Sequence, residues 1–374
     1  MPNVLVLAGT RPEAIKVAPV VRALRNSPRC SAMLCSTGQH REMLEQAFAD
    51  FDLTLDEDLR VMSANQSLAS LSARLFQSID PLLERLKPDW LLVQGDTTTV
   101  MVASLCAFYR KIKIGHIEAG LRSFSKYAPF PEEINRKVAG VTADLHFAPT
   151  AGARDNLLRE GITAEDIVVT GNTVIDSLLW IKEQVVNTPH ILPAAVERHI
   201  GAGGKMVLIT GHRRENFGRG FLDLCEAIKT LAHKYRDVLF VYPVHLNPNV
   251  QEPVHKLLVG IDNVMLLEPV SYKPFVALMN ASTLVLTDSG GVQEEAPSLG
   301  KPVLVMREVT ERMEGVEAGT ALLLGTDVDK LVNGVSSLLD DEAFYRKMSR
   351  ASNPYGDGLA TERIVEALFK RSMH

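Results

Sequence analysis

The stretch DWLLVQGDTTTVMVASLCAFYRKIKIGHIEAG, residues 89–120, contains two apolar runs separated by a segment of helical period. DWLLVQGD (89–96) and IKIGHIEAG (112–120) have the pattern of buried strands, and the segment between them predicts a helix over about 99–111. Strands that are apolar on both faces and joined by helices are typical of parallel sheets with helices on both sides. The stretch therefore predicts one βαβ unit of a doubly wound sheet.

The same alternation continues on both sides of this unit, in two series. The first series adds the runs VLVLAG (4–9), DLHFAPT (144–150) and DIVVTG (166–171), with a helix predicted over about 12–26. The second series begins at 205 and contains KMVLITG, VLFVYPV, NVMLLEP, STLVLTDSGG and KPVLVM. We therefore predict two Rossmann-like doubly wound α/β domains that face each other across a cleft. The expected domains are 1–171, completed by a C-terminal helix in 358–374, and 172–357.

The composition narrows the class of protein. A chain of 374 residues exceeds one ordinary core, and 46% hydrophobic with 23% charged residues is a normal globular balance. A net charge of −5 gives no reason to expect nucleic acid or an anionic membrane as partner. The start, MPNVLVLAGTRPE, lacks the basic region of a secretory signal, and four cysteines without a CxxC pair indicate neither a disulfide scaffold nor a zinc site. We expect a cytoplasmic protein that holds no metal.

The distinctive loops all follow predicted strands. GTRPE, QGDTTT, HIEAGLR, TGHRREN and DSGG each come directly after an apolar run. In parallel sheets of this type, ligands bind beyond the carboxyl ends of the strands. The distribution of these loops therefore predicts a binding site.

The loop GTRPEAIK, residues 9–16, carries two cations at the start of a helix. Thr10 and Glu13 have the spacing of a capping box, which explains them without any function. Capping does not explain Arg11 and Lys16, because cations at the positive end of a helix favour a bound anion such as phosphate. The loop is no GxxxxGK[ST] motif, and GxGxxG is absent, so neither ATP hydrolysis nor a dinucleotide cofactor is supported.

The segment TDSGGVQEEAPSLGKP, residues 287–302, predicts a second anion site. Gly290 and Gly291 follow Ser289 and would let a phosphate approach the N–H groups at a helix start. The two oxygens of Glu295, about one turn further, can accept hydrogen bonds from both hydroxyls of a ribose. A tight turn with a solvated acidic first turn is the alternative. The pattern favours a nucleoside diphosphate.

Further cations and a histidine lie in two other loops. In TGHRRENFGRGF, residues 210–221, His212 stands beside two arginines, where it could reach a diphosphate or a leaving group. An exposed histidine without function is the alternative. Arg312 in VTERMEG can add another cation.

Three carboxylates from separate strand ends can converge in the first domain. Asp96, Glu118 and Glu132 would form an acid–base set if their surroundings separate their pKa values. The alternatives are that Asp96 caps a helix and that the others are surface carboxylates. Glu133 and Lys137, four residues apart, are interpreted as an ordinary helical ion pair.

With these residues assembled, the chain resembles the non-hydrolysing UDP-N-acetylglucosamine 2-epimerases of bacteria. The resemblance covers essentially the whole chain, in the order GTRPEAIK, QHREMLEQ, QGDTTT, HIEAGLRS, PFPEEINR, TGHRRENFGRG, TDSGGVQEEAPSLGKPVLVMR and TERMEGVEAGT. It implies two domains of the GT-B type, a homodimer, and an isomerase that interconverts UDP-GlcNAc and UDP-ManNAc without a cofactor. It also implies that the product supplies cell-surface polysaccharide.

The resemblance also implies roles for individual positions. The residues expected to be catalytic are Asp96, Glu118, Glu132 and His212. The residues expected to bind substrate are Arg11, Lys16, Arg136, Phe275, Ser289, Gly290, Gly291, Glu295 and Arg312, with Phe275 near the uracil. Gln39, His40 and Gln46 match part of a second site at which the substrate activates family members, although an amphipathic helix start is the alternative. The chain departs from the family at Val270, where Gln is frequent, and at Met313, where Pro is commoner.

The mechanism that the resemblance implies avoids a carbanion at C2 of the sugar. Loss of UDP from C1 together with the C2 proton gives 2-acetamidoglucal, and UDP then adds back with a proton delivered to the opposite face. The carboxylates would supply base and acid, and the cations would hold the departing diphosphate. Three alternatives stay open: a GT-B glycosyltransferase, a hydrolysing epimerase that releases ManNAc and UDP, and a UDP-sugar sensor without turnover.

Overall fold

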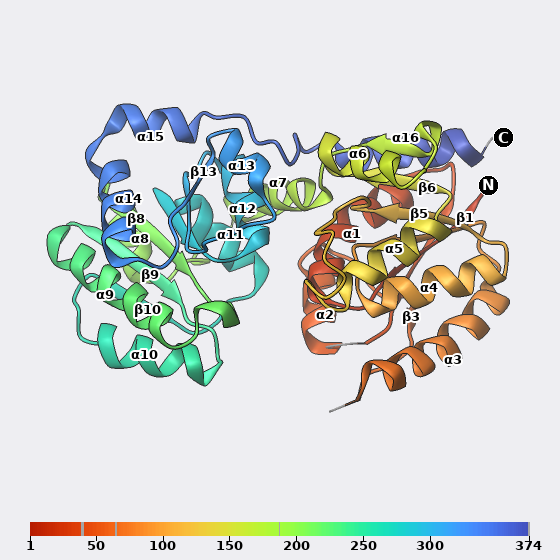
Figure 1. Cartoon of the computed structure of the whole chain (residues 1–374), viewed down its shortest axis with the longest axis horizontal. Helices are drawn as coiled ribbons and strands as arrows, with labels where there is room; N and C mark the ends of the chain where they lie inside the picture. Colours follow the sequence, from red (N-terminus) through yellow and green to blue (C-terminus); the bar gives the residue numbers. More distant parts are fainter. Residues whose placement is uncertain (39–40, 64–65, 187, 373–374) are drawn as a thin grey trace. The chain divides into compact units, whose positions relative to one another are not determined.

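The computed structural model divides the chain into two units, and it describes residues 1–38, 41–63, 66–186 and 188–372. The first unit comprises Met1–Ser177 and the C-terminal segment that begins at Tyr355. The second unit comprises Leu178–Pro354. Helix α7, Thr173–Val186, contains the first crossing between them. Each unit contains one parallel sheet with helices on its faces (Figure 1).

The sheet of the first unit is entirely parallel and has the strand order β3-β2-β1-β4-β5-β6-β7. Its strands are β1 (Asn3–Ala8), β2 (Ser31–Ser36), β3 (Glu57–Asp58), β4 (Trp90–Gln94), β5 (Lys113–Ile117), β6 (Leu145–Ala148) and β7 (Ile167–Val169). Its helices are α1 (Arg11–Asn26), α2 (Arg41–Ala49), α3 (Leu68–Leu86), α4 (Thr98–Tyr109), α5 (Glu132–Thr142), α6 (Ala151–Arg159), the short η1 (Ala164–Asp166) and α16 (Ala360–Ser372).

Strand β1 is buried on both faces, which is why its apolar run has no polar alternation. Leu5 and Leu7 pack into a core with α3 and α4, and the intervening Val4 and Val6 are equally buried. Helices α1, α2 and α16 form a separate packed group, so α16 brings the end of the chain back to α1 (Figure 1).

The second unit repeats this architecture with six parallel strands in the order β10-β9-β8-β11-β12-β13. The strands are β8 (Lys205–Thr210), β9 (Val238–Pro243), β10 (Val264–Leu267), β11 (Leu284–Thr287), β12 (Val303–Val305) and β13 (Ala321–Leu323). The helices are α8 (Ala194–Gly201), η2 (Arg214–Asn216), α9 (Arg219–Lys234), α10 (Pro248–Leu258), α11 (Tyr272–Ala281), α12 (Gly290–Glu295), η3 (Ala296–Leu299), α13 (Met313–Glu317), α14 (Val328–Asp340) and α15 (Glu342–Ser349).

Both sheets have a point at which the chain order reverses. In the first sheet it lies between β1 and β4, and in the second it lies between β8 and β11. Helices leave the two strands at such a point on opposite faces, so the strands' carboxyl ends border an open crevice. Four of the loops that the sequence analysis singled out follow these four strands, and the fifth, HIEAGLR, follows the neighbouring strand β5.

The prediction of two doubly wound parallel sheets is confirmed. The strands that the sequence analysis did not find are β2, β3 and β13, which are short, polar or partly exposed. None of the helices in the described ranges combines the length and the hydropathy that a membrane span requires.

Two buried histidines lie side by side in the first sheet. His116 on β5 is in register with His146 on β6, and both side chains are 1% exposed. The Nε2 of His116 hydrogen-bonds to the carbonyl of Gly95 at 2.7 Å, whereas its Nδ1 has no partner among the described residues. Burial lowers the pKa of both histidines from 6.5 to about 4. The fold therefore keeps both rings neutral.

We expect the first unit to lose stability as the pH falls from 6.5 to 4. In this window the unfolded chain binds protons that the folded unit excludes, so each histidine lowers the free energy of unfolding by up to about 3 kcal/mol at pH 4. His146→Gln should flatten this dependence. Urea unfolding followed by Trp90 fluorescence in a Trp180→Phe background measures the first unit. The exposed His255→Gln variant is the control, and an unchanged pH dependence in His146→Gln would contradict the expectation.

Candidate functional site

The carboxylate of Glu118 is held by three side chains at the carboxyl end of β5. Lys16 of α1 donates to both oxygens at 2.6 and 2.7 Å, and this ion pair is mostly buried, with side-chain exposures of 15% for Lys16 and 5% for Glu118. Gln94 and Asn172 donate their amide hydrogens to the same carboxylate. Such a group is fixed in place and charge-compensated, because a buried carboxylate without these donors would be costly.

The backbone of Glu118 is in the left-handed region, with φ of 64°. Non-glycine residues are uncommon there, and they persist where surrounding contacts determine the conformation. The amide of Ala119, the next residue, is bonded to the carbonyl of Phe147 at 3.0 Å, which fixes the chain directly after Glu118. The conformation aims the Glu118 side chain at the donors from α1 and β4.

Asp96 does not cap the following helix, so that alternative is wrong. Thr97 is the N-cap of α4, and its hydroxyl accepts from the amide of Val100. The Oδ2 of Asp96 instead accepts a hydrogen bond from the Nε of Arg136 at 2.8 Å, and the Nη2 of the same guanidinium lies 2.8 Å from this oxygen in an ion pair. Its Oδ1 has no hydrogen-bond partner in the part of the chain that the structure describes. Asp96 thus has one anchored oxygen and one available oxygen.

The interpretation of Glu133 and Lys137 as an ordinary helical ion pair is wrong, because Glu133 pairs with other residues. Glu133 is 1% exposed, and its carboxylate accepts from the amides of Ser123 and Phe124 at 3.0 and 3.2 Å. It also pairs with Arg136 at 3.2 Å, three residues along the helix. The spacing of residues along the helix could not reveal these contacts, because the loop that precedes the helix supplies the two amide donors.

Glu132, the residue beside it, is only half-buried at the first position of α5. Its side chain makes no hydrogen bond or ion pair with any residue in the described ranges. The structure therefore brings Lys16 together with Glu118, and Arg136 together with Asp96, but it shows no contact of Glu132 with either group.

The start of α1 has the predicted capping box. The carboxylate of Glu13 accepts from the amides of Gly9 and Thr10, and the hydroxyl of Thr97 donates to its other oxygen at 2.6 Å. Arg11 begins the helix, is half-buried, and has no ion-pair partner among the residues described. Its guanidinium is consequently available at the positive end of α1.

In the second unit, His212 follows β8 and is anchored to a buried aspartate. The carboxylate of Asp288, after β11, accepts from the backbone amides of His212 and Arg213. The His212 ring lies 3.5 Å from this carboxylate and stacks on His245, with ring centroids 5.5 Å apart. Burial lowers the pKa of His212 despite the opposing effect of Asp288, so the ring is neutral at pH 7.

The predicted Ser289-Gly290-Gly291 helix start begins the short helix α12. Ser289 is its N-cap, without a side-chain capping bond. A Cβ on Gly290 would lie 3.0 Å from the Arg312 guanidinium carbon, whereas one on Gly291 would meet only Glu295 and Ser289, at 3.8 Å or more. A side chain at position 290 would therefore push against Arg312, whose guanidinium pairs with Glu294 at 3.0 Å.

Glu295 and Phe275 complete the predicted set in this unit. The Oε1 of Glu295 accepts from the hydroxyl of Tyr272 at 2.5 Å, and both residues are buried. Phe275 lies one turn along α11 from Tyr272 and is half-buried. Glu295 is thus a positioned acceptor, with Tyr272 already bonded to one oxygen.

The sequence reasoning missed several groups that complete these sets. They are Gln94, Glu133, Asn135, Asn172, Tyr272 and Asp288. Gln94 and Asp288 belong to the quoted segments QGDTTT and TDSGG, so their position at strand ends could have identified them as site residues. Of the residues predicted to bind an activator, Gln46 of α2 donates a hydrogen bond to Asp50, the residue after this helix. Gln39 and His40 lie outside the described residues.

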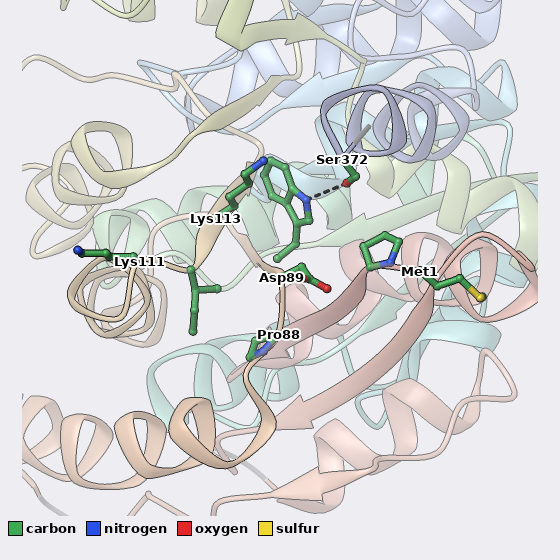
Figure 2. A pocket seen from close by; sticks show the side chains of 9 residues that line it. Met1, Pro88, Asp89, Lys111, Lys113 and Ser372 are labelled. Carbon is green, nitrogen blue, oxygen red and sulfur yellow. Dashed lines mark hydrogen bonds between the residues drawn. The ribbon is translucent and has the colours of Figure 1, made fainter. Parts of the chain in front are cut away.

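A pocket of about 480 Å³ lies at the opposite end of the strands of the first sheet, beside the amino-terminal ends of β4 and β5 (Figure 2). Trp90 lies in its wall and donates to the hydroxyl of Ser372 at 2.9 Å, with Asp89, Lys111 and Lys113 nearby. None of the predicted site residues lines this pocket. The carboxyl ends of the strands remain the candidate site.

The fold and these groups define an α/β enzyme with two Rossmann-like units, whose charged side chains gather at the chain-order reversals. A family model described as UDP-N-acetylglucosamine 2-epimerase matches residues 22–369. The UDP-N-acetylglucosamine 2-epimerases of Yersinia pestis and Escherichia coli K12 are each 53% identical over 368 residues, which is 98% of this chain and 98% of theirs. The crystal structure of the Neisseria meningitidis UDP-GlcNAc 2-epimerase bound to UDP-GlcNAc is similar with a TM-score of 0.90 and 47% identity, over 98% of this chain and 100% of that one.

The chain belongs to the UDP-N-acetylglucosamine 2-epimerase family, and it is an isomerase. The predicted fold class, with two Rossmann-like domains of the GT-B type, is confirmed by the same likeness.

Lys16→Met should destabilise the first unit by about 3 kcal/mol, because it removes the cation that is paired with the buried Glu118 carboxylate. Lys16→Met combined with Glu118→Gln should recover part of this loss, since the uncompensated charge is then removed. Urea unfolding monitored through Trp90, with Trp180 replaced by Phe, measures both. A single variant as stable as the parent would show that the ion pair does not hold this region.

Proposed function

We propose that this protein interconverts UDP-GlcNAc and UDP-ManNAc by elimination and re-addition of UDP. The base removes the C2 proton, the C–H electron pair forms the C1=C2 double bond, and the C1–O pair leaves with UDP. The reverse addition delivers a proton to the other face of C2 while a diphosphate oxygen attacks C1. Neither step needs an oxidant or a reductant, and no free carbanion forms at C2.

The observation that carries this proposal is the hydrogen bonding of the Asp96 carboxylate, whose two oxygens differ. Arg136 anchors Oδ2, which orients the carboxylate, and Oδ1 has no partner in the described part of the chain. A general base needs an oriented group with a free lone pair within reach of the proton. Asp96 meets this requirement better than Glu118, whose two oxygens both accept from Lys16. We therefore assign Asp96 as the base toward the gluco epimer.

Glu118 and Glu132 would have different tasks. The bonded Glu118 is suited to orienting Lys16 and the sugar, and to returning a proton only when substrate displaces one of its donors. Glu132 is half-buried, and its side chain makes no hydrogen bond or ion pair in the described ranges, which suits proton delivery to the second face of C2. The similar Neisseria meningitidis epimerase has been crystallised with UDP-GlcNAc bound, which supports UDP-GlcNAc as the substrate proposed here.

The charge of the departing diphosphate needs cations and N–H groups. Arg11 at the start of α1 has no ion-pair partner among the described residues, and Lys16 lies one turn further along the same helix. In the second unit, Arg312 lies against Gly290 at the start of α12, and the neutral His212 can donate a hydrogen bond. Such preorganised donors stabilise charge as it develops on a leaving group.

Incubation of UDP-GlcNAc in D₂O tests the reaction. The parent protein should form UDP-ManNAc that carries deuterium at C2, as followed by NMR and mass spectrometry. Asp96→Asn should lower the exchange of the C2 hydrogen by at least about 10²-fold, since general base catalysis is typically worth 10²–10⁴-fold. UDP binding, measured by calorimetry, should persist in this variant.

Other products would select an alternative. Free ManNAc and UDP would indicate a hydrolysing epimerase, transfer of the sugar to an acceptor would indicate a glycosyltransferase, and binding without any exchange would indicate a sensor. An Asp96→Asn variant with the parent's exchange rate would remove Asp96 from the mechanism.

Gly290→Ala should weaken UDP binding by about tenfold, because its methyl group would displace the Arg312 guanidinium at 3.0 Å and costs one charge-assisted contact. Gly291→Ala is the matched control, since its Cβ meets nothing closer than 3.8 Å. Calorimetry with UDP measures both variants. Equal losses in the two would show that backbone approach, rather than Arg312, determines affinity.

Three further expectations stay predictions. They are assembly as a homodimer, activation by substrate through Gln39, His40 and Gln46, and supply of the epimerised sugar to cell-surface polysaccharide.

A further inference from the structure

Helix α5 holds the Asp96 loop by three separate contacts. Arg136 donates from Nε to the carboxylate and forms an ion pair with it through Nη2, and Asn135 donates to the Asp96 carbonyl at 2.9 Å. On the strand side, His116 holds the carbonyl of the preceding Gly95 at 2.7 Å. Both the backbone and the side chain of Asp96 are therefore fixed.

Arg136 is itself fixed by Glu133, one turn earlier on the helix. The Nη1 of Arg136 lies 3.2 Å from the Oε2 of Glu133, so the guanidinium bridges two carboxylates through different nitrogens. The Arg136 side chain is only 15% exposed, and Glu133 is 1% exposed. A planar guanidinium shared in this way loses most of its rotational freedom.

We propose that Glu133 is a positioning residue for the epimerisation: it orients Arg136, and Arg136 holds Oδ2 of Asp96 so that Oδ1 faces the substrate. The inference rests on the function proposed above. Glu133 does not touch the reacting atoms, and its effect passes through Arg136. The sequence analysis did not place Glu133 in the site, because it interpreted Glu133 as the partner of Lys137 in a helical ion pair.

The chemical reason is the difference between an oriented and a freely rotating base. Rotation of the Asp96 carboxylate, or its approach to Arg136 through both oxygens, would remove the free oxygen from its place. Misplacement of a reacting group by about 1 Å can lower the rate by about 10²-fold. Because Glu133 occupies Nη1, Arg136 presents Nε and Nη2 to a single oxygen.

The competing role for Glu133 is purely structural. Its carboxylate also accepts from the amides of Ser123 and Phe124, and so it fixes the loop that precedes α5. A substitution that only loosened this loop would lower the stability or raise KM, without any dependence on Arg136. A double-mutant cycle separates the two roles, since residues that act through one another have non-additive effects.

The experiment measures kcat and KM for UDP-GlcNAc, with C2 deuterium incorporation, in the parent, Glu133→Gln, Arg136→Lys and the double variant. Glu133→Gln keeps the size of the side chain but places an amide donor against Nη1. We expect kcat to fall about 10- to 100-fold with little change in KM. In the Arg136→Lys background, the same substitution should change kcat by less than about twofold.

Glu160→Gln is the matched control. Glu160 pairs with Arg122 through two hydrogen bonds of 2.8 and 2.6 Å, but neither residue contacts Asp96, so kcat should stay at the parent value. Thermal melting of every variant checks folding. If Glu133→Gln does not fold, Glu133→Asp replaces it, because the shortened carboxylate also withdraws from Nη1.

The outcomes decide between the roles. An unchanged kcat in Glu133→Gln, or a loss of the same size in both backgrounds, would overturn the inference. A parent protein that incorporates no deuterium at C2 would instead overturn the proposed function, and the two failures are thus distinguishable.

Discussion

The candidate site of the first unit depends on one topological constraint, the reversal of chain order between β1 and β4. Parallel strands place their carboxyl ends at one edge, and the reversal opens that edge between α1 and α4. Gly9, directly after β1, shows how closely the chain segments approach here, since a Cβ on it would lie 2.6 Å from the hydroxyls of Thr37, after β2, and of Thr99 in α4. At this end of the sheet, Lys16 of α1 meets the carboxylate of Glu118, which follows β5.

Charge compensation is the second principle of the site, and it differs between the two carboxylates. Glu118 is surrounded by donors on both oxygens, whereas Asp96 is bonded through one. Two carboxylates in one unit thus have unlike surroundings, which is the condition for unlike roles in proton transfer. In the second unit, the buried Asp288 is bonded to backbone amides and so shapes the loop around His212.

Sequence patterns predicted the fold well because long apolar runs and capping residues are local signals. The run 4–9 and the capping box of Thr10 and Glu13 appear in the structure as expected. The edge strand β3 has two polar residues, so no periodicity could reveal it. Residues that follow strands were recognised as candidates, but partners such as Asn172 and Tyr272 were not. Their contacts join positions 54 and 23 residues apart, and only the folded chain brings these together.

The carboxylate of Glu13 has a wider consequence, because one buried group serves two helix starts. It caps α1 and at the same time accepts from Thr97, the N-cap of α4. The Glu13 carboxylate thereby links the loop before α1 to the loop before α4. Libraries that diversify these loops to change the accepted sugar should therefore vary positions 13 and 97 together. A substitution at only one of them would leave the other side chain without its hydrogen-bond partner.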